Sequence, residues 1–380
     1  MIYVKKYERW TLVRAYTQKY QQAEKKDKSF ILNSLSNLTG YHRKYLMNIL
    51  AHPPGLQLKP LIRDRKLSYE SVLPLLKKLW TISNFACGKR LVPAIPIYLE
   101  ALARHKELRV NKEEKKLLLK ISPATVDRML KRAKKAISLK GRSKTKPGTL
   151  LKNQIPIHTF ADWDEAKPGF LEIDLVHHCG NSTFGEYIYT LDTCDVATGW
   201  NECAAFLGKL RKHTVEATDK IRERLPFPLL GVDFDTGGEF VNWHFIWYCQ
   251  NKNITYTRAR EGRKNDQAYI EQQNYSVVRR FVGYSRIDTK EQLEILNHLY
   301  ELLSDYQNFF QPVMRLKEKR RDGAKVTRRY DKPKTPYERV LEHKEIKTSV
   351  KRELRKRFLK LNPKILLVNI TTLGRQLSKR

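Results

Sequence analysis

The sequence predicts an α/β domain with a mixed sheet flanked by helices, preceded by two all-α units and followed by a basic extension. Three strand-like runs, at residues 170–178, 187–194 and 200–206, follow one another closely enough to form an antiparallel meander. Helical and strand-like runs then alternate through residues 214–282, which is typical of an α/β domain. The segments before this block have helical apolar spacing, and the segment after it is dominated by Lys and Arg.

The length and charge of the chain indicate several domains and a polyanionic partner. A chain of 380 residues exceeds one ordinary core, so two or three domains are expected. The net charge is +34, yet residues 168–285 carry 13 Lys or Arg against 15 Asp or Glu. The positive excess therefore lies in the flanking segments. A near-neutral block between basic arms indicates a catalytic unit held between segments that bind nucleic acid. Solvated Lys-rich helix faces are the alternative, but they do not readily explain so large an excess.

The cysteines and the apolar runs bear on the cellular compartment. The five cysteines are odd in number, are scattered and form no CxxC, which indicates free thiols rather than disulfides or a zinc site. No apolar run approaches the roughly 18–20 residues of a membrane span. The N-terminus, MIYVKKYERW, lacks the apolar core of a signal peptide. We therefore expect an intracellular, cytoplasmic protein associated with chromosomal DNA, with no membrane partner.

Residues 1–55 are expected to form the first all-α unit. A helix of roughly regular apolar spacing ends where Gly40 interrupts the pattern, and a second short helix covers residues 41–51. A helix, a turn and a polar, basic helix form the outline of a helix-turn-helix motif, whose second helix enters a major groove. Arg43 and Lys44 are then candidate DNA contacts, although many helical hairpins share this outline.

Residues 68–137 are expected to form a second all-α unit with a clearer helix-turn-helix candidate. Ser122 is a good N-cap, and Pro123 suits the first helical position. The helix that follows would bury its apolar residues and expose its basic ones. Four exposed residues are candidate DNA contacts: Thr125, Arg128, Lys131 and Arg132. The alternative is a basic helix that is merely solvated.

A basic linker is expected at residues 138–160. It contains GRSKTKPG, in which Arg142 and Lys144 are candidate contacts to DNA phosphates. An ordinary solvent-exposed linker is compatible with the same composition.

Three carboxylates in the central block point to metal chemistry. Asp235 follows the apolar run 228–232 and precedes a Gly pair, so it is expected at the end of a buried strand. Glu271 lies 36 positions later, in a helix that begins near residue 265. Asp174 lies on the first strand, and it is adjacent to Asp235 if the two strands are neighbours. Carboxylate oxygens are suitable ligands for Mg²⁺, and three carboxylates suit a two-metal site for phosphoryl displacement.

Other polar residues compete for these roles. Asp192 and Asp195 close the second strand and are possible ligands, but aspartates that form a turn are the preferred interpretation. Asp233 shares a sheet face with Asp235 if the strand continues, but Asp235 is preferred because the Gly pair lies just after it, beyond Thr236. A metal role for the histidine pair at 177–178 is a minor alternative.

The three carboxylates occur in a pattern that resembles a known family. EIDLV, DTGGEF and NDQAYIE, with 35 residues between the second and third carboxylates, resemble the Asp-Asp-Glu core of insertion-sequence transposases and retroviral integrases. The resemblance spans about residues 155–310. It implies a ribonuclease-H-like fold, two divalent ions (Mg²⁺ or Mn²⁺), and catalytic and metal-binding roles for Asp174, Asp235 and Glu271. Thr236 stands where the family commonly has Asn, which leaves the metal ligands intact and removes a side-chain amide near them.

This resemblance sets the functional expectation. The chain would be a DDE-type DNA transposase that binds element ends and joins them to target DNA by metal-dependent transesterification, within a catalytic core at residues 161–312. Arg263, Lys264 and Gln267, near Glu271, are further candidate DNA contacts. Paired DNA ends imply double-stranded DNA as the partner and a homo-oligomer assembled on it. The alternatives are a hydrolytic nuclease of the same fold and a DNA-binding regulatory or capture protein with a silent core.

The last segment, residues 313–380, is expected to bind DNA or a partner, or to stay largely disordered until it binds. Within it, the apolar run 365–370 predicts one strand.

Overall fold

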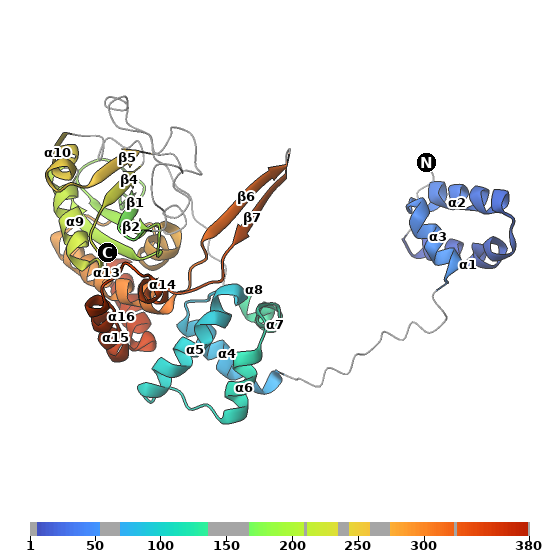
Figure 1. The fold of residues 1–380 in the computed structure, drawn as a ribbon, viewed down its shortest axis with the longest axis horizontal. Helices are drawn as coiled ribbons and strands as arrows, with labels where there is room; N and C mark the ends of the chain where they lie inside the picture. Colours follow the sequence, from blue (N-terminus) through green and yellow to red (C-terminus); the bar gives the residue numbers. More distant parts are fainter. Residues whose placement is uncertain are drawn as a thin grey trace. The chain divides into compact units, whose positions relative to one another are not determined.

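The computed structural model describes residues 6–53, 69–135, 167–208, 211–234, 243–258, 274–322 and 325–378. The chain divides into two compact units, Met1–Ser68 and Tyr69–Arg380 (Figure 1). Each unit is described by itself below. Within the described ranges, no helix combines the length and the apolar character needed to cross a membrane.

The first unit is a small bundle of three helices, α1 (Lys6–Gln22), α2 (Lys25–Thr39) and α3 (Arg43–Ala51). Gly40 ends α2 in the left-handed conformation, with φ of +71°, which a glycine adopts without strain. A core of side chains from all three helices holds the bundle together: Val13, Tyr20, Ile31, Leu32, Leu35, Leu46 and Leu50. The two helices expected around Gly40 are confirmed, and their use as a DNA-reading motif stays a prediction.

A five-stranded mixed sheet forms the centre of the second unit. Its strands are β1 (Phe170–His177), β2 (Ile188–Asp195), β3 (Asn201–Leu207), β4 (Gly231–Phe234) and β5 (Thr255–Arg258), in the order β3-β2-β1-β4-β5. The first three are antiparallel, as the meander predicted, whereas β4 pairs parallel to β1 and β5 parallel to β4. This mixed sheet is consistent with the ribonuclease-H-like core that the resemblance implied.

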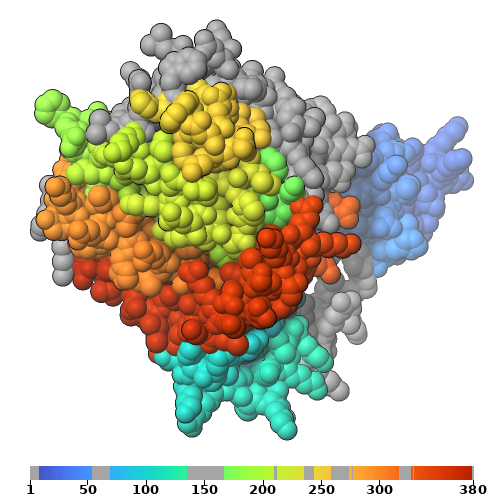
Figure 2. Space-filling model, turned by 60° about the vertical axis from the view of Figure 1, so that its left-hand side comes forward, coloured from blue at the N-terminus to red at the C-terminus, as the bar shows by residue number. Residues whose placement is uncertain are grey.

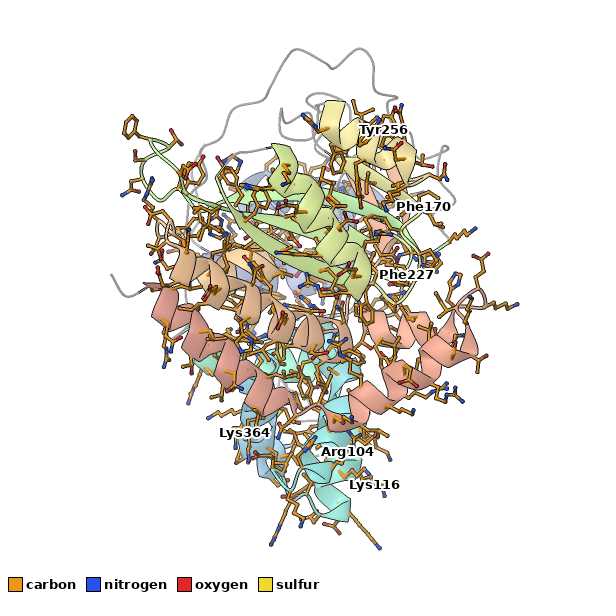
Figure 3. All side chains as sticks on the ribbon, turned by 90° about the vertical axis from the view of Figure 1, so that its left-hand side faces the viewer. Arg104, Lys116, Phe170, Phe227, Tyr256 and Lys364 are labelled. Atoms are coloured by element: carbon orange, nitrogen blue, oxygen red, sulfur yellow. The ribbon has the colours of Figure 1, made fainter. Side chains whose placement is uncertain are left out.

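Helices cover both faces of the sheet. On one face, α9 (Arg211–Arg224) and α10 (Trp243–Asn251) pack on alternate strand residues such as Ile173 and Phe234. Figure 3 looks onto these two helices, with α9 lying across the strands. On the opposite face lies α13 (Lys290–Phe310). The π-helix η2 (Asn274–Arg279) and the short α12 (Arg280–Val282) precede α13 in the chain.

The helical block of residues 69–135 packs on α13, one of the helices that cover the sheet. It comprises η1 (Glu70–Val72), α4 (Leu73–Ile82), α5 (Gly88–Arg104), α6 (Lys112–Lys120), α7 (Pro123–Met129) and α8 (Lys131–Lys135). On α13, Tyr306 Oη donates to the backbone oxygen of Ile82 at 2.6 Å. Just beyond that helix, Gln311 Nε2 donates to Tyr98 Oη at 3.0 Å. These buried bonds tie the block firmly to α13.

The C-terminal segment is folded, so the alternative that it stays largely disordered until it binds is wrong for its described residues. After the hairpin β6 (Leu316–Asp322) and β7 (Lys325–Tyr330) come the helices α14 (Pro336–Glu342), α15 (Thr348–Lys360) and α16 (Pro363–Ser378). In Figure 2 the red C-terminal segments lie between the core and the cyan helical block. Arg104 of α5 donates to the backbone oxygen of Phe358 at 3.2 Å, which links that block to α15.

The strand predicted at residues 365–370 is also wrong, because α16 is a helix. Asn362 Oδ1 accepts from the backbone N–H of Lys364, and Pro363 occupies the first position, both of which favour a helix start. The buried residues Leu366, Ile370, Gly374 and Leu377 recur every three or four positions. That helical period places one face of α16 against α13.

We expect Gly374→Ala to destabilise the second unit, because a methyl group at this position would overlap the backbone oxygen of Phe281. Overpacking of this kind costs about 1–3 kcal/mol, which outweighs the gain of about 1 kcal/mol in helix propensity. Urea unfolding of the full chain measures the effect, with the exposed Gln376→Ala as control. A Gly374→Ala protein as stable as the wild type would contradict this packing.

Candidate active site

Asp174 lies in the middle of β1, on the sheet face that packs against α13. Its neighbours Ile173 and Leu175 point to the other face and join the core under α9 and α10. The half-buried carboxylate accepts the backbone N–H of Leu175 at Oδ1, at 2.7 Å, and the side-chain amide of Asn274 at Oδ2, at 2.5 Å. Two donors thus fix the carboxylate's orientation.

The pairing of β1 with β4 brings the end of β4 beside Asp174. Ile173 pairs with Phe234 in parallel register. Phe234 is the last described residue before Asp235, and Asp174 directly follows Ile173. The condition for bringing Asp174 and Asp235 together, that these two strands are neighbours, is therefore met, whereas Asp235 itself lies outside the described residues.

The helical segment after Glu271 also reaches Asp174. Glu271 lies outside the described residues, but Asn274 follows it by three positions and begins η2. Asn274 Nδ2 makes the bond to Asp174 noted above, while Oδ1 is buried without a hydrogen-bond partner among the described residues. A π-helical turn is rare and occurs often at functional sites.

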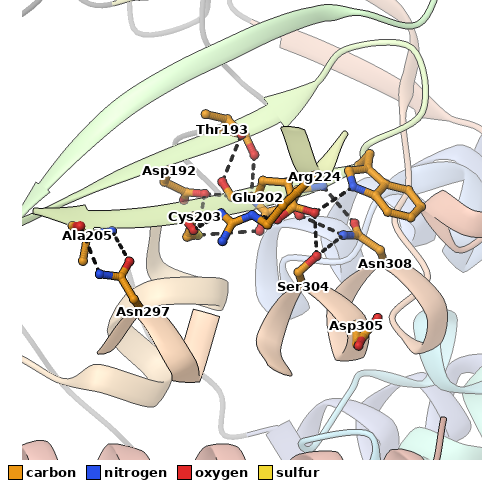
Figure 4. A network of polar contacts seen from close by, with 12 residues as sticks. Asp192, Thr193, Glu202, Cys203, Ala205, Arg224, Asn297, Ser304, Asp305 and Asn308 are labelled. Carbon is orange, nitrogen blue, oxygen red and sulfur yellow. Dashed lines mark hydrogen bonds and ion pairs between the residues drawn. The ribbon is translucent and has the colours of Figure 1, made fainter. Parts of the chain in front are cut away.

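Asp192 faces Asp174 from the adjacent strand, and its interpretation as a turn residue is wrong. It lies within β2, directly opposite Asp174 in antiparallel register, and is fully buried. Asn201 Nδ2 donates to its Oδ1 at 2.7 Å and Cys203 Sγ donates at 3.3 Å, as Figure 4 shows. Its Oδ2 has no hydrogen-bond partner among the described residues. Burial raises the pKa of Asp192 to about 7, and the negative charge of Asp174 adds to the rise.

The other residues that competed for a metal role have structural partners. Asp195 accepts the backbone N–H of Gly169 and two bonds from Thr198, so its assignment to a turn is confirmed. Asp233 is fully buried and accepts the hydroxyl of Thr257 at 2.7 Å. His178 is fully buried, and desolvation lowers its pKa to about 3, so the ring is neutral.

The donor atoms around Asp174 suit a hard divalent cation. Among the described residues, no group of three or more His, Cys, Asp or Glu is arranged to hold a metal ion. Two of the three expected ligands lie outside those residues. The atoms that are described are oxygens: the Asp174 carboxylate, and the unpartnered Asp192 Oδ2 and Asn274 Oδ1. Oxygen ligands favour Mg²⁺ or Mn²⁺ over softer ions, so these residues fit the implied metal.

In the first unit, the two candidate DNA contacts have different surroundings. Arg43 and Lys44 are both exposed on α3. The Arg43 guanidinium donates to Asn33 Oδ1 at 2.5 Å and to Ser29 Oγ at 2.7 Å, so it holds α3 on α2. No pattern in the sequence indicates this role for Arg43.

In the second unit, the candidate DNA contacts lie around the end of α7. The N-cap is confirmed, because Ser122 Oγ accepts the backbone N–H of Thr125 at 3.2 Å. The expected continuous helix is interrupted after Met129, and α8 follows. Arg128, Lys131 and Arg132 are exposed, whereas Thr125 is half-buried. The remaining candidates lie outside the described residues: Arg142, Lys144, Arg263, Lys264 and Gln267.

We expect Asp192→Asn to flatten the pH dependence of stability between about pH 4 and pH 7. The folded-state pKa of about 7 exceeds the unfolded value of 3.8, so the folded state keeps a proton that the unfolded chain loses. The stabilisation is full below the unfolded pKa and is lost as the pH rises through 7. The slope for one proton is at most about 1.4 kcal/mol per pH unit. Urea unfolding across this range, in the presence of a chelator, tests this, and equal slopes for variant and wild type would contradict it.

Comparison with known proteins gives one extensive sequence match. No protein-family model matches the chain. Similar solved structures include the catalytic core domain of BIV integrase, with a TM-score of 0.30 and 16% identity over 45% of this chain and 91% of that one. The HTLV-2 integrase catalytic core domain in complex with magnesium has a TM-score of 0.29 and 15% identity, over 38% of this chain and 90% of that one. The uncharacterized protein y4rM of Sinorhizobium fredii is 38% identical over 332 residues, which are 87% of this chain and 94% of that protein. The chain therefore belongs to the same family as y4rM.

Proposed function

We propose that this protein is a DDE-type DNA transposase, which cleaves DNA at element ends and joins those ends to target DNA. One observation carries the proposal. Asp174 is the point where the end of β4 and the start of η2 meet, and these segments border the other two carboxylates of the sequence motif.

The chain geometry limits how far those carboxylates can lie from Asp174. Consecutive Cα atoms are about 3.8 Å apart, so the backbone of Asp235 stays within one such step of Phe234, beside Ile173. Glu271 precedes Asn274 by three residues, and three residues of chain span at most about 10–11 Å. These limits support a cluster of Asp174, Asp235 and Glu271.

The three carboxylates would hold the divalent ions, which supply charge stabilisation at the oxygens of the reacting phosphate. The protein's own contribution is positioning. The Leu175 N–H and the Asn274 amide fix Asp174 before any cation or DNA arrives. Such preorganisation removes the cost of reorienting the carboxylate during the reaction. No nucleophilic side chain is needed, because water or a DNA 3′-hydroxyl attacks the phosphodiester.

DNA affinity is assigned to the flanking segments. The near-neutral charge of residues 168–285 gives the catalytic block little attraction for a phosphate backbone. The exposed Arg128, Lys131 and Arg132 lie in the basic segment before it. Their positions support a DNA contact at the end of α7, in the segment predicted as a helix-turn-helix.

We expect Asp174→Asn, Asp235→Asn and Glu271→Gln each to lower DNA cleavage and strand transfer at least about a hundredfold, because each removes one negative charge from the cation site. The substrate is a duplex carrying the DNA that flanks the reading frame, with Mg²⁺ or Mn²⁺. Glu301→Gln is the control, since Glu301 is an exposed acid on α13.

Four outcomes of this experiment distinguish the candidate functions and test the site. Strand-transfer products that the three variants lose support a transposase. Cleavage without joined products indicates a nuclease of the same fold. Undiminished activity in the variants excludes the site, and metal-independent DNA binding without any cleavage indicates a regulatory or capture protein.

We expect Lys131→Ala/Arg132→Ala to weaken DNA binding and to reduce the slope of log K against log salt by about 2, since each phosphate contact contributes roughly 0.9. Lys212→Ala/Lys220→Ala removes two exposed charges from α9 and is the matched control. Fluorescence anisotropy over a salt series, without metal, measures both slopes. Equal slopes for the two double variants would exclude Lys131 and Arg132 from the DNA interface.

A further inference from the structure

Asp192 is a buried carboxylate that the three-carboxylate motif does not include. The strand register places three residues in one row across the sheet: Cys203 on β3, Asp192 on β2 and Asp174 on β1. Residues directly opposite on antiparallel strands share a face, and their Cβ atoms are roughly 4.5–5.5 Å apart. Asp192 is therefore the acidic side chain opposite Asp174 on its own face.

We propose that Asp192 is a fourth acidic residue of the metal site, and that its Oδ2 binds the cation held by Asp174, directly or through a bound water. This inference rests on the proposed function, because it requires a divalent ion at Asp174. It adds a residue outside the Asp-Asp-Glu motif.

The two oxygens of Asp192 have different surroundings, which argues for this role. Oδ1 is held by Asn201 Nδ2 and Cys203 Sγ, so protein groups fix the orientation of the carboxylate. Oδ2 is buried and accepts no hydrogen bond from the described residues. Leaving a buried acceptor unsatisfied costs about 1–3 kcal/mol. A cation, or a water bound to one, would satisfy this oxygen.

A purely structural role explains the bonds to Asp192 Oδ1, but it does not explain why Oδ2 is buried without a hydrogen-bond partner among the described residues. Asp192 would then serve to anchor Asn201 and Cys203, and a neutral Asn would do so equally well through its carbonyl oxygen. Glu202, on the adjacent strand β3, shows how a structural carboxylate differs. It is 2% exposed, its Oε1 accepts from Ser304 Oγ at 2.6 Å and Trp200 Nε1 at 3.0 Å, and its Oε2 lies 3.2 Å from Arg224 Nε. Its Oε2 makes this ion pair without a hydrogen bond, so a cationic side chain of the protein neutralises it, as the bound cation would at Asp192 Oδ2 (Figure 4).

Titration of the DNA-free full chain with Mn²⁺, followed by calorimetry, tests the proposal without measuring activity. We expect Asp192→Asn to bind Mn²⁺ 10- to 100-fold more weakly than the wild type, as removal of supporting ligand groups generally does. Asp174→Asn should abolish binding. Glu202→Gln is the matched control and should keep the wild-type affinity for Mn²⁺ even if its thermal stability falls.

The outcomes distinguish this inference from the function on which it rests. Wild-type affinity in Asp192→Asn, together with lost binding in Asp174→Asn, overturns the role of Asp192 and leaves the proposed function intact. No Mn²⁺ binding by the wild type overturns both. Thermal unfolding confirms that each variant is folded. If Asp192→Asn does not fold, Asp192→Ser replaces it, because Ser removes the carboxylate with a smaller side chain and the same weakening is expected.

Discussion

The parallel pairing of β1 with β4 is the constraint on which the proposed site depends. It places the end of β4 beside Asp174, although the two strands are separated by β2, β3 and α9 in the chain. The register is held from the opposite face, where Leu171, Ile173, Val232 and Phe234 are buried beneath α9 and α10. A slip of one residue would move every side chain to the other face and bury Asp174 among apolar residues. The hydrophobic core under α9 and α10 therefore determines where the carboxylates lie.

The face that carries Asp174 combines apolar packing with a dense polar network. Tyr300 of α13 and His178 both lie within hydrogen-bond distance of Thr190, and Asn308 of α13 bonds the backbone of Asn201. These bonds satisfy buried polar groups and fix α13 on the sheet. Basic charge is concentrated outside this domain, so metal binding and DNA binding are assigned to different parts of the chain. That separation allows a site rich in carboxylates to work on a polyanion.

Much of this fold is readable from the sequence, but the strand register is not. Alternating and continuous apolar runs predicted the strands β1 to β4, whereas the pairing of β1 with β4 entered only as a condition for bringing Asp174 and Asp235 together. The sequence alone does not show that Asp192 lies opposite Asp174, because that pairing appears only when β1 and β2 are aligned. Asp192 was therefore assigned to a turn. The α16 helix was assigned in part to a strand because the apolar run 365–370 is locally ambiguous, and only burial of Leu366, Ile370 and Leu377 reveals its period. The internal role of Arg43 depends likewise on a tertiary contact with α2.

The most direct test of a cation site shared by the three carboxylates is to map where a divalent ion binds along the chain. Fe²⁺ in place of Mg²⁺, with ascorbate and peroxide, generates radicals that cut the polypeptide backbone close to the bound metal. If the three carboxylates share one cation site, the cuts will fall near Asp174, Asp235 and Glu271 together, and excess Mg²⁺ will suppress all of them. Cuts at other positions, or cuts that Mg²⁺ does not suppress, would contradict a cation site at the junction of β1, β4 and the segment leading into η2.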